Sequence, residues 1–115
     1  MYLLTTSRNL AFVMLCTAML PLTTASAQQA TEIQISYSKG QFQPREVRAP
    51  ADKPVVFRIR NLEAKAMEFE STSLRVEKVV AANSQGVVNV RALKPGRYEF
   101  YDDFNESARG ALVVE

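Results

Sequence analysis

The sequence predicts an all-β fold, a Greek-key antiparallel β-sandwich of roughly seven or eight strands. Two observations lead to this prediction. Short segments alternate apolar and polar residues, and turn-forming residues separate these segments at intervals of about ten residues. Such alternation suits a sheet with one buried face and one solvated face. A chain of 115 residues is long enough for one domain of this kind and too short for two.

The clearest strand lies at 54–60, where Val55, Phe57 and Ile59 alternate with two arginines. The same pattern places the other strands at residues 33–37, 42–47, 67–70, 74–80, 86–90, 97–101 and 111–114. Turns are expected at residues 39–40, 50, 83–86, 95–96 and 105–110. Segment 74–80 could also be drawn as a helix, but its three valines favour a strand.

Residues 1–27 are typical of a secretory signal peptide. Arg8 precedes an apolar stretch from Leu10 to Leu22, and the segment ends in Ala25-Ser26-Ala27, which predicts cleavage before Gln28. The stretch of about 13 apolar residues falls short of the roughly 20 that cross a bilayer as a helix. We therefore expect a periplasmic domain at residues 28–115 with no membrane insertion; an uncleaved anchor is the alternative.

The composition of the expected domain excludes several functions. Its 115 − 27 = 88 residues contain 13 basic and 12 acidic side chains, with no Cys and no His. The balanced charge and the lack of a basic run argue against nucleic-acid binding. Without His there is no His-based catalytic triad, and the commonest metal ligand is missing. Without Cys there is no disulfide.

Two stretches resemble the cupredoxins. The first is Phe42–Val47, with the pattern F-x-P-x-x-V, followed by an apolar strand that ends in Asn61. The second is Leu93–Tyr101, which contains P-G-x-Y-x-F and is followed after a loop by Gly110–Val114. The resemblance extends from residue 32 to residue 115 and implies a cupredoxin-like sandwich.

In that family the metal lies at one end of the sandwich, and its ligands are a Cys, two His and usually a Met. The resemblance places Asp102 at the position of the Cys, Asn105 near the second His and Glu68 near the first. A type 1 blue copper centre is therefore excluded, because it requires a thiolate and two imidazoles.

Oxygen ligands take the place of sulfur and imidazole. We expect residues 67–70 and 101–106 to meet at the same end of the sandwich, with Glu68, Glu70 and Asp102 as metal ligands. Carboxylates that converge raise one another's pKa unless a cation joins them, and they suit Fe(III), Mn(II), Ca(II) or Mg(II). Each acid could equally be an ordinary surface charge.

Three further candidate ligands are close to these residues in the sequence. Asp103 alternates with Asp102, so at most one of the two should point inward. Met67 is expected in the core beside Phe69, although its thioether would favour copper if it reached the metal. Glu77 most simply pairs with Lys78 at the surface and is a secondary metal candidate.

The segment Met67–Ser71, followed by residues 74–80, is similar to small exported cupredoxin-like proteins found with bacterial high-affinity iron permeases. The resemblance implies an accessory protein that binds an iron or copper ion and assists Fe(II) oxidation or delivery to a membrane permease. Other periplasmic iron-uptake proteins would be its partners, and a homodimer could complete the coordination shell. Catalysis by the chain itself is not expected. The alternative function is a metal-free interaction module. Tyr101 and Phe104 bracket the acids, where they could shield a metal from water, form an apolar rim for a partner or simply pack the loop.

Overall fold

The computed structural model describes residues 16–22 and 29–115, and the predicted cleavage site after Ala27 lies outside these ranges. The described part of the chain contains nine strands: β1 (Thr31–Ser38), β2 (Gln41–Gln43), β3 (Glu46–Ala49), β4 (Val55–Asn61), β5 (Met67–Ser71), β6 (Val76–Val80), β7 (Gln85–Val90), β8 (Gly96–Asp102) and β9 (Asn105–Val114). Within these ranges the chain forms no helix suited to crossing a membrane.

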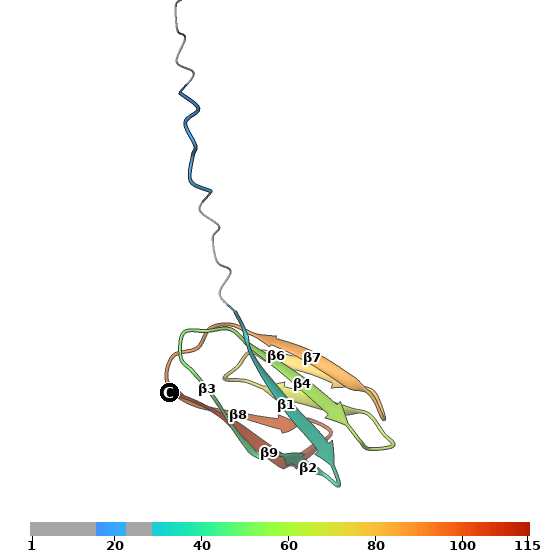
Figure 1. Cartoon of the computed structure of the whole chain (residues 1–115). Coiled ribbons are helices and arrows are strands. Elements are labelled where there is room, and N and C mark those ends of the chain that lie inside the picture. Colours follow the sequence, from blue (N-terminus) through green and yellow to red (C-terminus); the bar gives the residue numbers. More distant parts are fainter. Residues whose placement is uncertain (1–15, 23–28) are drawn as a thin grey trace, which may run out of the picture.

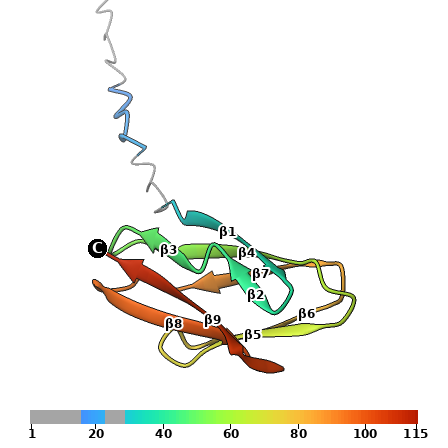
Figure 2. The same cartoon turned by 90° about the horizontal axis from the view of Figure 1, so that it is seen from below.

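The strands form two packed layers, which confirms the all-β sandwich. One sheet has the order β2-β1-β4-β7 and the other the order β3-β9-β8-β5-β6 (Figure 1). Figure 2 shows the layers from the side, with β1 and β4 in one and β5 and β8 in the other. The interior between the layers is lined by the apolar face of each strand.

Both sheets are mixed, whereas the sequence predicted antiparallel pairing throughout. β1 pairs with β4 in parallel, and β3 pairs with β9 in parallel. The expected strand at 42–47 is in fact two strands, because the chain leaves the first sheet after β2 and adds β3 to the second. After β3 the chain rejoins the first sheet as β4, which runs parallel to β1. Local alternation identifies a strand and its buried face but does not identify its partner.

Four phenylalanines from both sheets form the centre of the core. Phe42, Phe57, Phe69 and Phe100 are fully buried, and the ring centroids of Phe69 and Phe100 are 4.9 Å apart. Aromatic pairs of this kind contribute about 0.5–1.5 kcal/mol each beyond the area they bury. Met67 is also fully buried in this core. The sequence favoured this core position for Met67 over a role as a metal ligand.

Asn61, at the end of β4, ties the first sheet to the start of β5. Its side chain is completely buried, and Nδ2 donates to the backbone oxygens of Lys65, Val80 and Ala81. Its Oδ1 accepts the backbone N–H of Glu63 at 3.0 Å. These bonds fix the loop between β4 and β5, and so they set the position of the acidic strand that follows.

Candidate metal centre

The outer face of β5 gathers carboxylates. Met67 and Phe69 point into the core, so Glu68 and Glu70 project from the opposite face of the strand. In the antiparallel register Glu70 lies opposite Glu77 on β6 and opposite Tyr101 on β8. Because directly opposite residues share a face of the sheet, Glu77 lies on the same side as Glu68 and Glu70.

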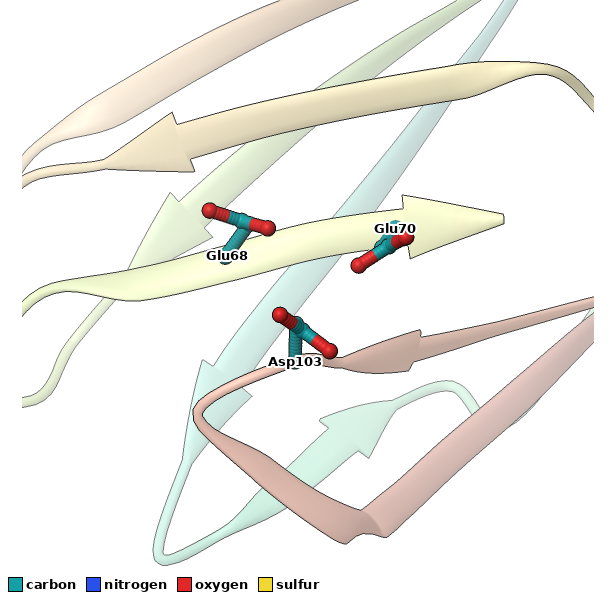
Figure 3. Close-up of side chains that lie close together, drawn as sticks. All are labelled: Glu68, Glu70 and Asp103. Carbon is teal, nitrogen blue, oxygen red and sulfur yellow. The ribbon is translucent and has the colours of Figure 1, made fainter. Parts of the chain in front are cut away.

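Asp103 reaches this face from the turn after β8. Its backbone N–H donates to the backbone oxygen of Glu68 at 2.9 Å, which holds the turn against β5. One carboxylate oxygen from each of Glu68, Glu70 and Asp103 lies within 4.8 Å of the others, and Figure 3 shows Asp103 directed toward the space between the two glutamates. We call these three residues the carboxylate cluster.

No positive side chain neutralises the carboxylate cluster. Among residues 29–115, none of the ion pairs between Lys or Arg and an acid involves Glu68, Glu70 or Asp103. Lys78 lies opposite the core residue Phe69 and therefore belongs to the other face of β6. The expected surface pair of Glu77 with Lys78 does not form; the Glu77 carboxyl instead meets that of Glu68.

The carboxyls of this face raise one another's pKa. Glu68 is only 8% exposed, and burial followed by the neighbouring carboxyls of Glu77, Asp103 and Glu70 raises its pKa to about 6. Burial, Asp103 and Glu77 also raise the pKa of Glu70, an effect that the Tyr101 hydroxyl partly opposes. A bound cation reverses such shifts because it favours the ionised form. The cluster therefore has the electrostatic character of a cation site.

Asp102 lies apart from the cluster, in the interior. It is 2% exposed, and its Oδ2 accepts the hydroxyl of Tyr37 at 2.6 Å. Its Oδ1 accepts the backbone N–H groups of Glu68 and Phe104, at 2.9 and 3.0 Å. Burial, and then the hydrogen bond to Asp102, raise the pKa of Tyr37 to about 12. The Asp102 oxygens are thus engaged by the protein itself.

The structure therefore brings together three of the predicted ligands and separates two. Glu68, Glu70 and Asp103 converge, whereas Asp102 and Met67 face the core. Alternation correctly predicted that Asp102 and Asp103 point in opposite directions. It did not reveal that Asp102 lies opposite Phe69 and is therefore the inward member. A different pairing, that of β5 with its neighbour β6, brings in Glu77, which the sequence offered only as a secondary candidate.

The donor set decides which metals fit. A type 1 copper centre does not fit, because the sequence contains no His and its single Cys, Cys16, lies outside the sandwich. The position compared with the family's Cys is Asp102, whose oxygens are already bonded. Carboxylates alone suit a hard cation such as Fe(III), Mn(II), Ca(II) or Mg(II).

Comparison with known proteins agrees with this fold. A family model described as a cupredoxin-like domain matches residues 10–114. The uncharacterized protein RP394 of Rickettsia prowazekii is 32% identical over 84 residues, which cover 72% of this chain and 67% of RP394.

Two solved structures share the architecture at low identity. The metal-binding domain of the Cu(I)-exporting P-type ATPase CopA from Streptococcus pneumoniae has a TM-score of 0.67 at 13% identity, covering 77% of this chain and 98% of that one. Auracyanin A, a blue copper protein from Chloroflexus aurantiacus, has a TM-score of 0.64 at 15% identity, covering 76% of this chain and 100% of that one. At these identities the likeness to the two copper proteins shows the fold alone. The chain belongs to the cupredoxin-like domain family.

Proposed function

We propose that this protein is an exported, periplasmic accessory of a high-affinity iron uptake system, which binds iron and delivers it to a membrane permease. The observation that carries the proposal is the carboxylate cluster. Three acids converge within 4.8 Å, no Lys or Arg of the described chain pairs with them, and one of them is 8% exposed. An acid buried among other acids is destabilised unless a cation is present.

The donor atoms favour iron over copper. Oxygen ligands prefer hard ions, and they stabilise Fe(III) relative to Fe(II). Met67 is the one thioether of the expected domain, and it is fully buried in the core beside Phe69. A site made of carboxylates alone therefore supports capture of the ferric ion, and copper has less support from the ligands present.

The exposure of the cluster supports transfer rather than permanent storage. Asp103 is exposed and Glu70 is half-buried, whereas Glu68 lies beneath them. Three carboxylates also leave coordination positions for water or for groups of another protein, since iron commonly takes six ligands. A partner could therefore approach the ion from the solvent side. A permease with carboxylates of its own fits this role.

The proposal is tested by expressing the full-length sequence and measuring the metal content of the protein recovered from the periplasm without chelators. Recovery from that compartment tests export, and mass spectrometry of the elements tests the metal. We expect about one iron per chain, with the iron lost in Glu68→Gln. Glu99→Gln is the matched control, because the Glu99 side chain is exposed on β8 and outside the cluster. Equal iron in both variants would contradict the proposal.

A second function deserves a test because apolar side chains flank the acids. Phe104, next to Asp103, is 59% exposed, and Val79, opposite Glu68, is 53% exposed. An acidic patch with an apolar rim suits a basic partner protein and needs no metal. Under this alternative the protein carries no iron, and Phe104→Ser weakens partner binding while Glu68→Gln has little effect on metal content.

A further inference from the structure

A second charged site, of opposite sign, lies at the turn between β1 and β2. A cavity of about 410 Å³ opens there, and Lys39, Arg45 and Arg109 line it together with Asn105 and Ser107. We call these five residues the cationic pocket. Its lining is polar, and its volume lies within the range of small-ligand sites.

Three separate parts of the chain carry the cations: the β1–β2 turn, the segment between β2 and β3, and β9, which contains Arg109. Lys39 and Gly40 form the two-residue turn of the β1–β2 hairpin, with φ values of 53° and 66°, and Glu63 Oε1 accepts the Gly40 N–H at 3.0 Å. Arg45 lies between β2 and β3, and its backbone oxygen accepts the N–H of Ala111 at 2.8 Å. The pocket is therefore anchored by backbone bonds that do not use the cationic groups.

The cationic groups have no acidic partner. The ion pairs of the described chain involve Arg48, Arg58, Lys94 and Arg97, and none includes Lys39, Arg45 or Arg109. Glu63, which is close by, already accepts the Gly40 N–H, and Glu106 does not line the cavity. Like charges around one cavity repel one another, and an anion would reverse this repulsion.

The hydrogen-bonding groups of the pocket match an oxyanion. The guanidinium carbon of Arg109 lies 5.1 Å from the centroid of the Tyr101 ring, so the charge of Arg109 is held over β8 at the border of the pocket. Ser107 Oγ donates to Asn105 Oδ1 at 2.7 Å, and the Asn105 amide also hydrogen-bonds to the Tyr37 hydroxyl, so one amide N–H of Asn105 remains as a donor. Guanidinium groups bind carboxylates and phosphates through paired N–H bonds.

We propose that the cationic pocket binds a small multivalent oxyanion, either phosphate or a tricarboxylate. The site is distinct from the carboxylate cluster. Arg109 lies opposite Tyr101, which in turn lies opposite Glu70, so two strand spacings, or about 10 Å, separate the two backbones. Anion binding therefore requires no metal, and its failure would leave the proposed iron site unaffected.

The test is calorimetric titration of the metal-free, full-length protein with phosphate and, separately, with citrate at constant ionic strength. We expect saturable binding of one anion per chain. The anion that binds more tightly, phosphate or citrate, identifies the class of ligand that the pocket takes. Arg45→Gln and Lys39→Gln should each weaken the binding at least tenfold. Arg60→Gln, a cation removed from an exposed site outside the pocket, should leave it unchanged.

Two outcomes would overturn the proposal. One is no saturable binding of either anion at millimolar concentration, and the other is equal weakening by Arg60→Gln, which would indicate general charge screening. If Arg45→Gln does not fold, the affinity of Lys39→Gln is the test, because Lys39 is exposed in a turn and its replacement should not disturb the fold. The Glu68→Gln variant should retain full anion affinity, which separates this test from that of the iron site.

Discussion

The hydroxyl of Tyr37 donates to Oδ2 of Asp102 across 2.6 Å in the interior of the sandwich. Tyr37 belongs to β1 in one sheet and Asp102 to β8 in the other, so the bond joins the two layers. The other oxygen of Asp102 accepts the N–H groups of Glu68, which belongs to the carboxylate cluster, and of Phe104, which follows the cluster residue Asp103. Asp102 thus positions the cluster and does not belong to it.

Removing the Tyr37 hydroxyl should destabilise the fold. Tyr37→Phe leaves one oxygen of a buried carboxylate without its donor, and we expect the free energy of unfolding to fall by about 1–3 kcal/mol. Tyr98→Phe is the matched control, since its hydroxyl bonds to the backbone oxygen of Lys94 at an exposed site. Urea denaturation of both variants measures the difference. Equal losses would mean that the Tyr37–Asp102 bond has no special role.

The raised pKa of Glu68 makes stability depend on pH in a defined direction. Its pKa is about 6 in the folded protein and 4.5 ordinarily, so the folded state holds the proton more tightly. The free energy of unfolding of metal-free protein should therefore fall as pH rises from about 4.5 through about 6. Glu68→Gln removes this loss, so the variant should be more stable than the parent at neutral pH.

Chelator-treated protein, denatured by urea on both sides of this pH window, measures that effect. The advantage of Glu68→Gln over the parent should be larger above about pH 6 than below about pH 4.5. An advantage that is constant with pH would show that Glu68 does not titrate as described. Added metal should reverse the order at neutral pH, because only the parent gains binding energy.

Glu77 should act as an additional carboxylate of the metal site. It lies opposite Glu70, and its carboxyl contacts that of Glu68. Glu77→Gln should weaken metal binding by about tenfold, as loss of a neighbouring group commonly does. Titration of the variant beside Glu99→Gln measures this, and equal affinities would restrict the site to the carboxylate cluster.

Gly110 marks a close approach between β9 and the core. A Cβ atom there would lie 2.4 Å from Cε2 of Phe100 and 2.8 Å from the backbone oxygen of Arg45. Gly110→Ala should lower the free energy of unfolding by about 1–3 kcal/mol, because the ring and the backbone must both move. Gly96→Ala, where the nearest atom is 3.5 Å away, should have a much smaller effect. Thermal and urea denaturation distinguish the two.

Strand faces were predictable from the sequence, and strand partners were not. The alternation in Met67–Ser71 correctly placed Glu68 and Glu70 together on the outer face. The pairing of Phe69 with Asp102 brings together residues 33 positions apart (102 − 69), and no local pattern encodes it. For the same reason the sequence could not show which of the two adjacent aspartates joins the cluster, nor that β1 and β4 are parallel.

The cationic pocket could not be predicted from the amino-acid composition either. With 14 basic and 12 acidic residues, the composition shows no basic excess that would suggest an anion site. Arg109 is 64 positions beyond Arg45 in the sequence (109 − 45), and it meets Lys39 and Arg45 because β9 lies beside the β1–β2 turn and β3. Only the folded arrangement separates cations and acids into two sites.

Titration of metal into the full-length, metal-free protein at neutral pH tests the central claim most directly. With Fe(III), supplied as a weak soluble chelate, and with Mn(II) as a hard ion stable in air, we predict one ion bound per chain. Glu68→Gln and Asp103→Asn should abolish this binding, and Glu99→Gln should retain it. Absence of binding in the parent protein, or unchanged binding in both cluster variants, would contradict the account.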